Sequence, residues 1–339
     1  MPPGWPRLRL NGTAIQAVIT VPLFVWLYGW QTIDLVEWRT LTAAPFSVAL
    51  DPSQQFLYGS PFAHMLGAYY QRQGIGVVES FVIVHGAGLL LLAYAAARGL
   101  ITRCGVDQVA AGVMVIAASP LLLTMLSWIG KNDSFLLAFY LLLLSARSPL
   151  TRAILCALMI LCHRELGVAM LLAHALVRGE GVAVAGGAII GLALSYLYTN
   201  VLLDVAPVTR FDYMLAHARG LLIGVVRHPI VHFVAALGPF WIFVLRPSAL
   251  TMRRLAVLGI AAAVGAMTLD FTRIFVLASA PLVIQLTEEL VGEVREHGGI
   301  ACLGRRWPVS VLGILAFAQL QLAGDRLSWI RGFSWTITL

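Results

Sequence analysis

The sequence predicts an all-α, polytopic membrane protein, built as a bundle of about 10–11 transmembrane helices. The chain of 339 residues is 60% hydrophobic and only 12% charged, and its mean hydropathy is +0.86. Soluble domains carry about 25% charged residues, because their surfaces face water. Apolar runs of about 17–20 residues, the length that crosses a bilayer core, recur from one end of the chain to the other.

These apolar runs define the expected elements. No polar or Pro-rich linker interrupts them, so we expect a single domain over residues 1–339. The stretches 31–78 and 204–228 combine aromatic residues with amphipathic segments, which is typical of helices lying in the membrane interface. Residues 289–307 form a charged loop that we assign to the cytoplasm. The spans are expected at residues 14–30, 79–97, 109–128, 134–147, 151–162, 166–178, 181–203, 229–246, 254–270, 273–288 and 308–324.

Charge and cysteine usage exclude several classes of protein. The net charge is +7, but the arginines stand at the ends of apolar runs as topology signals and form no nucleic-acid-binding face. Two arginines precede residues 14–30, and no small-residue cleavage site follows, so this run is expected as a first span with a cytoplasmic N-terminus. The four cysteines lack metal-like spacing, and His228 and His232 lack the glutamate of a zinc protease motif. No metal is therefore expected.

The segment "LMILCHRELGVAML" places His163, Arg164 and Glu165 inside an apolar run. If residues 151–178 form one helix, these groups lie near mid-bilayer, where a charge costs about 2.5–3.5 kcal/mol. If they form a hairpin of two short helices, the triplet lies at its tip. We prefer the hairpin, because it brings the polar residues to one, non-cytoplasmic face. These residues are Asp34, Glu37, Asp51, Lys131, Asp133, His163, Arg164, Glu165, Asp212, Asp270 and Arg273.

Acidic residues after the first span are candidates for a general base. Asp34 and Glu37 stand three apart and share a face if the segment is helical. A carboxylate there can accept a proton from an attacking hydroxyl. The alternative is a helix that lies in the membrane interface with both carboxylates facing water. Asp51, later in the same loop, is a third candidate.

Basic residues at two helix junctions are candidates for binding a phosphate. Lys131 precedes Asp133, which either orients a substrate or caps the following helix. Asp270 and Arg273 stand three apart and either neutralise each other or present an arginine fork to an anion. Together with the triplet at the hairpin tip, these residues predict a site for an anionic, lipid-linked substrate and a polar acceptor.

The order of these segments resembles the GT-C superfamily, the membrane glycosyltransferases that use polyprenyl-phosphate sugars. In that family a first span leads into a long external loop with an early acid, here Asp34, followed by "GSPFAHMLGAYYQRQG" and an arginine-bearing turn. A span opened by an aspartate and a pair of short helices come next, matched by "GKNDSFLLAFYLLLLSAR" and "LMILCHRELGVAML". The resemblance covers residues 14–205 with the loop 31–78, and 206–339 adds further helices. Two departures are the Asp-x-x-Glu order of the acids and the Ser60-Pro61 pair.

The resemblance implies a metal-independent, inverting glycosyltransferase with no cofactor and a polyprenyl-phosphate sugar as donor. Asp34, Glu37 or Asp51 would be the base. Binding of donor and acceptor would fall to Lys131, Asp133, His163, Arg164, Glu165, Asp270 and Arg273. The acceptor would be a hydroxyl on a glycan, lipid or protein, reached on the outer face of a membrane such as the bacterial inner membrane. Alternatives are a lipid-linked oligosaccharide polymerase or ligase, and a transporter or flippase for an anionic or lipid-linked substrate.

Overall fold

The computed structural model describes residues 35–101, 116, 119–121, 124–125, 130–227, 236–246, 251–268, 271–296, 320–323 and 326–329. The regular secondary structure of these residues is helical apart from one antiparallel hairpin, β1 (Leu320–Ala323) with β2 (Arg326–Trp329). The helices are α2 (Leu35–Ala43), η1 (Gln55–Gly59), α3 (Phe62–Arg72), α4 (Val77–Ile101), α7 (Asp133–Ser145), α8 (Pro149–Cys162), α9 (Arg164–Arg178), α10 (Gly181–Leu197), η2 (Tyr198–Leu202), α11 (Arg210–Arg227), η3 (Gly238–Phe240), α13 (Trp241–Val244), α14 (Met252–Ala266), α15 (Phe271–Ala278) and α16 (Ala280–Glu296).

The helical class is as predicted, but the hairpin corrects one detail. Residues 320–323, expected to end the span 308–324, are in a strand. Within the described residues, two helices are long and apolar enough to cross a membrane, Val77–Arg98 and Val184–Leu202. A third is added if Phe271–Ala278 and Ala280–Glu289, which meet at a bend of 52°, form one span. Helices able to cross a membrane are therefore present, and the larger number of spans stays a prediction.

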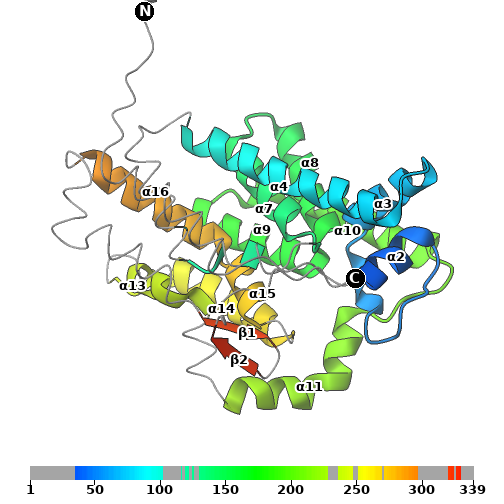
Figure 1. Ribbon diagram of the computed structural model, residues 1–339. Coiled ribbons are helices and arrows are strands. Elements are labelled where there is room, and N and C mark those ends of the chain that lie inside the picture. Colours follow the sequence, from blue (N-terminus) through cyan, green and yellow to red (C-terminus); the bar gives the residue numbers. More distant parts are fainter. Residues whose placement is uncertain are drawn as a thin grey trace, which may run out of the picture.

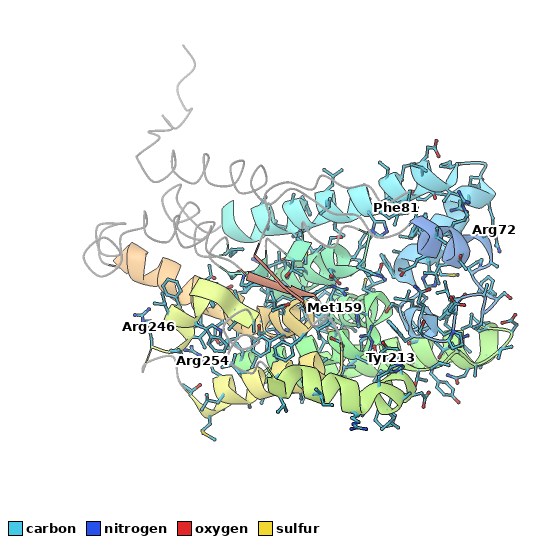
Figure 2. The ribbon with its side chains drawn as sticks, turned by 60° about the horizontal axis from the view of Figure 1, so that its bottom comes forward. Arg72, Phe81, Met159, Tyr213, Arg246 and Arg254 are labelled. Carbon is cyan, nitrogen blue, oxygen red and sulfur yellow. The ribbon has the colours of Figure 1, made fainter. Side chains whose placement is uncertain are left out.

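Helices α7, α8, α9 and α10 form the centre of the bundle, and α4 packs across α7 (Figure 1). Met159 of α8 lies in the middle of this group and is fully buried, whereas Arg72 and Arg254 lie at opposite ends of the molecule (Figure 2). Side chains on α7 are buried along most of its length. The apolar core is thus made mainly by helices from the middle of the sequence.

The segment 151–178 is a pair of helices that breaks at His163. The backbone of His163 is extended, with φ −160° and ψ 103°, so the helix does not continue through it. A Cβ on Gly167 would come within 2.8 Å of the carbonyl oxygen of Met159. Eight residues of continuous helix would separate these positions by about 12 Å. The chain therefore reverses, and the predicted hairpin is confirmed.

The loop after α2 is held by hydrogen bonds to Tyr198 and Asp204, which follow α10. We call this set of bonds the clasp. Asp204 accepts hydrogen bonds from the hydroxyl of Ser47 and from the backbone N–H of Val48, the latter at 2.9 Å. Its own N–H donates to the carbonyl of Phe46. Tyr198 also donates its hydroxyl proton to the carbonyl of Pro45. These bonds hold the loop over the end of α10, beside the site described below.

The clasp is expected to open in acid. Donation from Ser47, then from Val48, holds the pKa of the Asp204 carboxyl below its ordinary value. A depressed pKa contributes stability that is present at neutral pH and is lost as the pH falls below about 3.9, the value for a free aspartate. Asp204→Ala should therefore raise hydrogen exchange at Val48 near neutral pH, and acid should raise it in the parent protein. Asp51→Ala, an exposed carboxylate of the same loop, serves as the control. Unchanged protection in Asp204→Ala would contradict the clasp.

Candidate functional site

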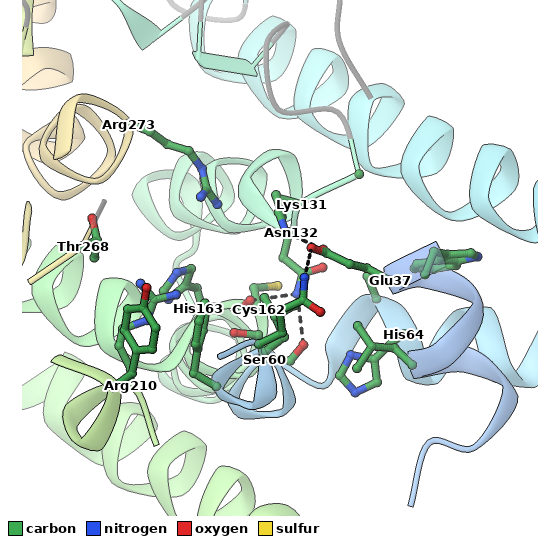
Figure 3. A pocket seen from close by; sticks show the side chains of 18 of the residues that line it. Glu37, Ser60, His64, Lys131, Asn132, Cys162, His163, Arg210, Thr268 and Arg273 are labelled. Atoms are coloured by element: carbon green, nitrogen blue, oxygen red, sulfur yellow. Dashed lines mark hydrogen bonds and ion pairs between the residues drawn. The ribbon is translucent and has the colours of Figure 1, made fainter. Parts of the chain in front are cut away.

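A cavity of about 290 Å³ lies where the first turns of several helices meet. Arg210 and Arg273 approach it from one side, and Glu37 and His64 from the other (Figure 3). The lining residues are Glu37, Trp38, Leu41, Gln54, Phe56, Leu57, Ser60, Ala63, His64, Gly130, Lys131, Asn132, Cys162, His163, Arg210, Tyr213, Met267, Thr268 and Arg273.

Several helices begin at the cavity wall. The helices α3, α7, α9 and α11 each begin at or beside a lining residue. The first N–H groups of a helix lack intrahelical partners, and the helix dipole places partial positive charge there. Four such ends around one cavity favour an anionic occupant, and basic side chains add to this potential.

The consecutive residues Lys131, Asn132 and Asp133 bind three different parts of the wall. Lys131 Nζ pairs with Glu37 Oε2 of α2 at 2.9 Å. Asn132 donates from Nδ2 to the carbonyl oxygens of Ser60, at 3.1 Å, and Cys162, at 2.8 Å (Figure 3). This short run before and at the start of α7 therefore joins the amphipathic loop to the hairpin of α8 and α9.

Asp133 makes the third connection, to Arg273 of α15. Arg273 Nε donates to Asp133 Oδ2 at 2.6 Å, and its Nη2 donates to Oδ1 at 2.8 Å. The two side chains are only 2% and 8% exposed. This is a buried, two-bonded ion pair, the geometry in which an arginine fork matches a carboxylate. It ties α15 to the start of α7 at the cavity wall.

Arg210 lines the cavity, and Arg164 lines a small pocket nearby. Arg164 Nη2 donates to Glu165 Oε1 at 3.1 Å, and its guanidinium lies against Gly59. Arg210 lies 4.4 Å above the ring of Phe56, and its Nε is 3.9 Å from Glu165 Oε2.

Charged side chains of both signs gather around the cavity. Within the part of the chain that the structure describes, the basic ones are Lys131, Arg164, Arg210 and Arg273, and the acidic ones are Glu37, Asp133 and Glu165. Each of the four basic groups lies within 3.9 Å of one of these carboxylates.

His163 is a neutral hydrogen-bond donor surrounded by basic side chains. Burial, reinforced by the nearby Arg210, Arg273, Lys131 and Arg164, holds the pKa of His163 well below its ordinary value. Its Nδ1 accepts the backbone N–H of Leu166 at 3.4 Å as the N-cap of α9. The neutral ring then carries its proton on Nε2, which can donate but cannot act as a base.

The residues proposed from the sequence fall into four groups. Glu37, Lys131, His163 and Arg273 line the cavity. Asp133 and Glu165 pair with the lining residues Arg273 and Arg210, and Arg164 pairs with Glu165. Asp51 is exposed and is absent from the lining. Asp34 and Asp270 lie outside the described residues.

Asp212, also expected on this face, has a different role. Its carboxylate accepts from the N–H of Thr209 at 3.1 Å, and its own N–H donates to the Thr209 hydroxyl at 3.1 Å. This is the reciprocal pattern of a capping box, so Asp212 fixes the start of α11. Arg210, in the first turn, is thereby held at the cavity.

Some lining residues escaped the sequence reasoning. Gln54 and Asn132 are uncharged, so a search for charges that converge on one face did not select them. Arg210 lies in a stretch that was recognised only as amphipathic. The Thr-x-x-Asp pattern at 209–212 was the available signal, since it starts a helix at Arg210.

Across the described residues, no group of three or more His, Cys, Asp or Glu side chains is arranged to hold a metal ion. No protein-family model, no curated protein and no solved structure matches the chain.

Proposed function

We propose that this protein is a membrane glycosyltransferase of the GT-C kind, which moves a sugar from a polyprenyl phosphate to an acceptor hydroxyl. The observation that carries the proposal is the cavity itself, where basic side chains and four helix N-termini lie around the carboxylate of Glu37. An anionic leaving group and a proton acceptor are what this transfer requires. Electrostatic stabilisation of the leaving phosphate is the largest catalytic contribution expected.

Each part of the cavity has a role in this reaction. Lys131, Arg210 and Arg273 offset the charge that develops on the phosphate, and neutral His163 donates a hydrogen bond from Nε2. Glu37 takes the acceptor's proton. Asp34, three residues earlier in the chain, is the alternative base. The acceptor reaches the cavity from the outer face of the membrane.

An apolar barrier favours an enzyme over a transporter. At the other end of α7 and α9, Tyr140 and His174 form a second polar network with Glu180. The side chains of Leu136 and Met170, on the intervening turns, are fully buried. Within the described residues, this apolar layer separates the network from the cavity.

Cavity size favours a single sugar over an oligosaccharide. Ligand pockets usually measure about 300–1,000 Å³, and this cavity of about 290 Å³ lies at the lower limit. A polymerase or ligase must accommodate a longer glycan. A donor carrying one sugar is therefore the substrate we propose.

Binding of a polyprenyl monophosphate tests the proposal. Arg210→Gln, in the full chain reconstituted in lipid nanodiscs, should weaken binding about tenfold, because a charge-assisted contact to the phosphate is lost. Arg219→Gln, an exposed arginine on the same helix, is the matched control and should bind as the parent does. Equal affinity in both variants would contradict the assignment. Movement of the lipid phosphate across the bilayer without sugar transfer would favour the flippase.

A further inference from the structure

We infer that the ion pair of Lys131 with Glu37 is a latch, which an anionic substrate opens to release the base. The inference rests on the proposed function, because it concerns the same cavity. In the structure, Glu37 Oε2 pairs with Lys131 at 2.9 Å and Oε1 accepts from Gln54 Nε2 at 3.1 Å. Both oxygens are engaged, so neither is placed to take a proton from an acceptor hydroxyl.

Lys131 is where an incoming phosphate competes with Glu37. It is the only lysine of the chain, and it stands two residues before Asp133, the first residue of α7. Its side chain and that of Glu37 are 19% and 20% exposed, so both reach the cavity. A phosphate bound there gains the ammonium and the N–H groups of α7 together. Glu37 contacts only the ammonium of Lys131, so the phosphate binds there more strongly and displaces it.

Glu37 is held less firmly than the start of α7, which carries Lys131. The Glu37 side chain can therefore move while Lys131 stays in place. Asn132 and Asp133 hold the start of α7 through Ser60, Cys162 and the buried Arg273. Glu37 lies in the first turn of the short helix α2, and its remaining polar partner is the side chain of Gln54. Displacement of Glu37 therefore needs a change of side-chain rotamer and leaves the wall intact.

Release of Glu37 couples donor binding to the chemical step. The freed carboxylate takes the proton of the acceptor O–H as the acceptor oxygen bonds to the sugar carbon. The bond from that carbon to the phosphate oxygen breaks, and its electron pair leaves on the phosphate, held by Lys131. A base that is released only when donor is present would not activate water in an empty cavity.

The test compares affinity with turnover in three full-chain variants in nanodiscs, with polyprenyl monophosphate as the probe. Glu37→Gln should bind the probe about three- to tenfold more tightly, since its competitor at Lys131 has lost its charge, and should lose sugar transfer. Lys131→Gln should bind more weakly. Glu79→Gln, an exposed carboxylate at the start of α4, is the control and should match the parent.

A purely structural role for Glu37 predicts the opposite sign. If the pair merely held the wall, Glu37→Gln would bind the probe more weakly or equally, and either result would overturn the latch. Glu37→Asp provides a second reading should the glutamine variant unfold, with tighter binding and partial transfer expected. Because Lys131 is the only lysine, its acetylation rate followed by mass spectrometry reports the freed ammonium directly, and the rate should rise in Glu37→Gln.

Failure of the proposed function gives a different result from failure of the latch. If the parent binds inorganic phosphate but no polyprenyl phosphate, the glycosyltransferase proposal fails. The latch is then kept, with a soluble anion, if Glu37→Gln tightens inorganic phosphate binding, and is overturned if affinity is unchanged or weaker.

Discussion

Arg273→Met is expected to cost about 3–5 kcal/mol of the free energy of unfolding. The change leaves the Asp133 carboxylate, only 2% exposed, without the two hydrogen bonds that Arg273 donates at 2.6 and 2.8 Å. A buried charge without its partner cannot regain the hydration that it lost on folding. Thermal or denaturant unfolding in detergent would measure the loss, which should be the largest among single substitutions of charged residues described above.

A double variant distinguishes this cause from a simple loss of packing. Removing both charges, in Asp133→Leu with Arg273→Met, should cost less than Arg273→Met alone, because no unpaired charge remains. Lys131→Gln serves as the comparison, since its pair with Glu37 is about 20% exposed and such pairs contribute about 1 kcal/mol or less. If the double variant is less stable than either single variant, the burial argument is wrong.

The sequence predicts the helix break at His163 because three ionisable residues interrupt an apolar run. It also selected Glu37, Lys131 and Arg273, which the structure brings to one cavity. The signal in each case was a charge inside or beside a hydrophobic segment, where its energetic cost demands a partner. That criterion identifies the residues that need a partner, but it does not predict which residue each one pairs with.

The partners depended on packing that no local pattern encodes. The sequence predicts Asp133 as a helix cap or as a group that orients substrate, yet it pairs with Arg273 across 140 positions of sequence. Asn132 carries no charge and still joins two segments through Ser60 and Cys162. The gathering of helix N-termini depends on chain direction as well as on burial. Such properties become visible only when the helices are placed in space.

Gly187→Leu is expected to separate α10 from α8 and to cost about 3 kcal/mol, at the upper end for overpacking. An added Cβ at Gly187 would lie 2.5 Å from the carbonyl oxygen of Ala153 and 2.8 Å from its Cα. Because these are backbone atoms, no rotamer change relieves the overlap. Gly191, one turn further, makes the same kind of approach to Ala157, at 2.9 Å. A Gly-x-x-x-Gly pattern allows this kind of close approach between two helices.

Gly186→Leu is the matched control for Gly187→Leu. A Cβ at Gly186 meets nothing within 4 Å, so the neighbouring position tolerates the same side chain on the same helix. Loss of a glycine from a helix interior should even stabilise this variant by about 0.5–1 kcal/mol. Unfolding of both variants in the same detergent would compare the two positions. Equal stability would show that α10 can shift away from α8 freely. The close packing of the two helices would then contribute little to the stability of the fold.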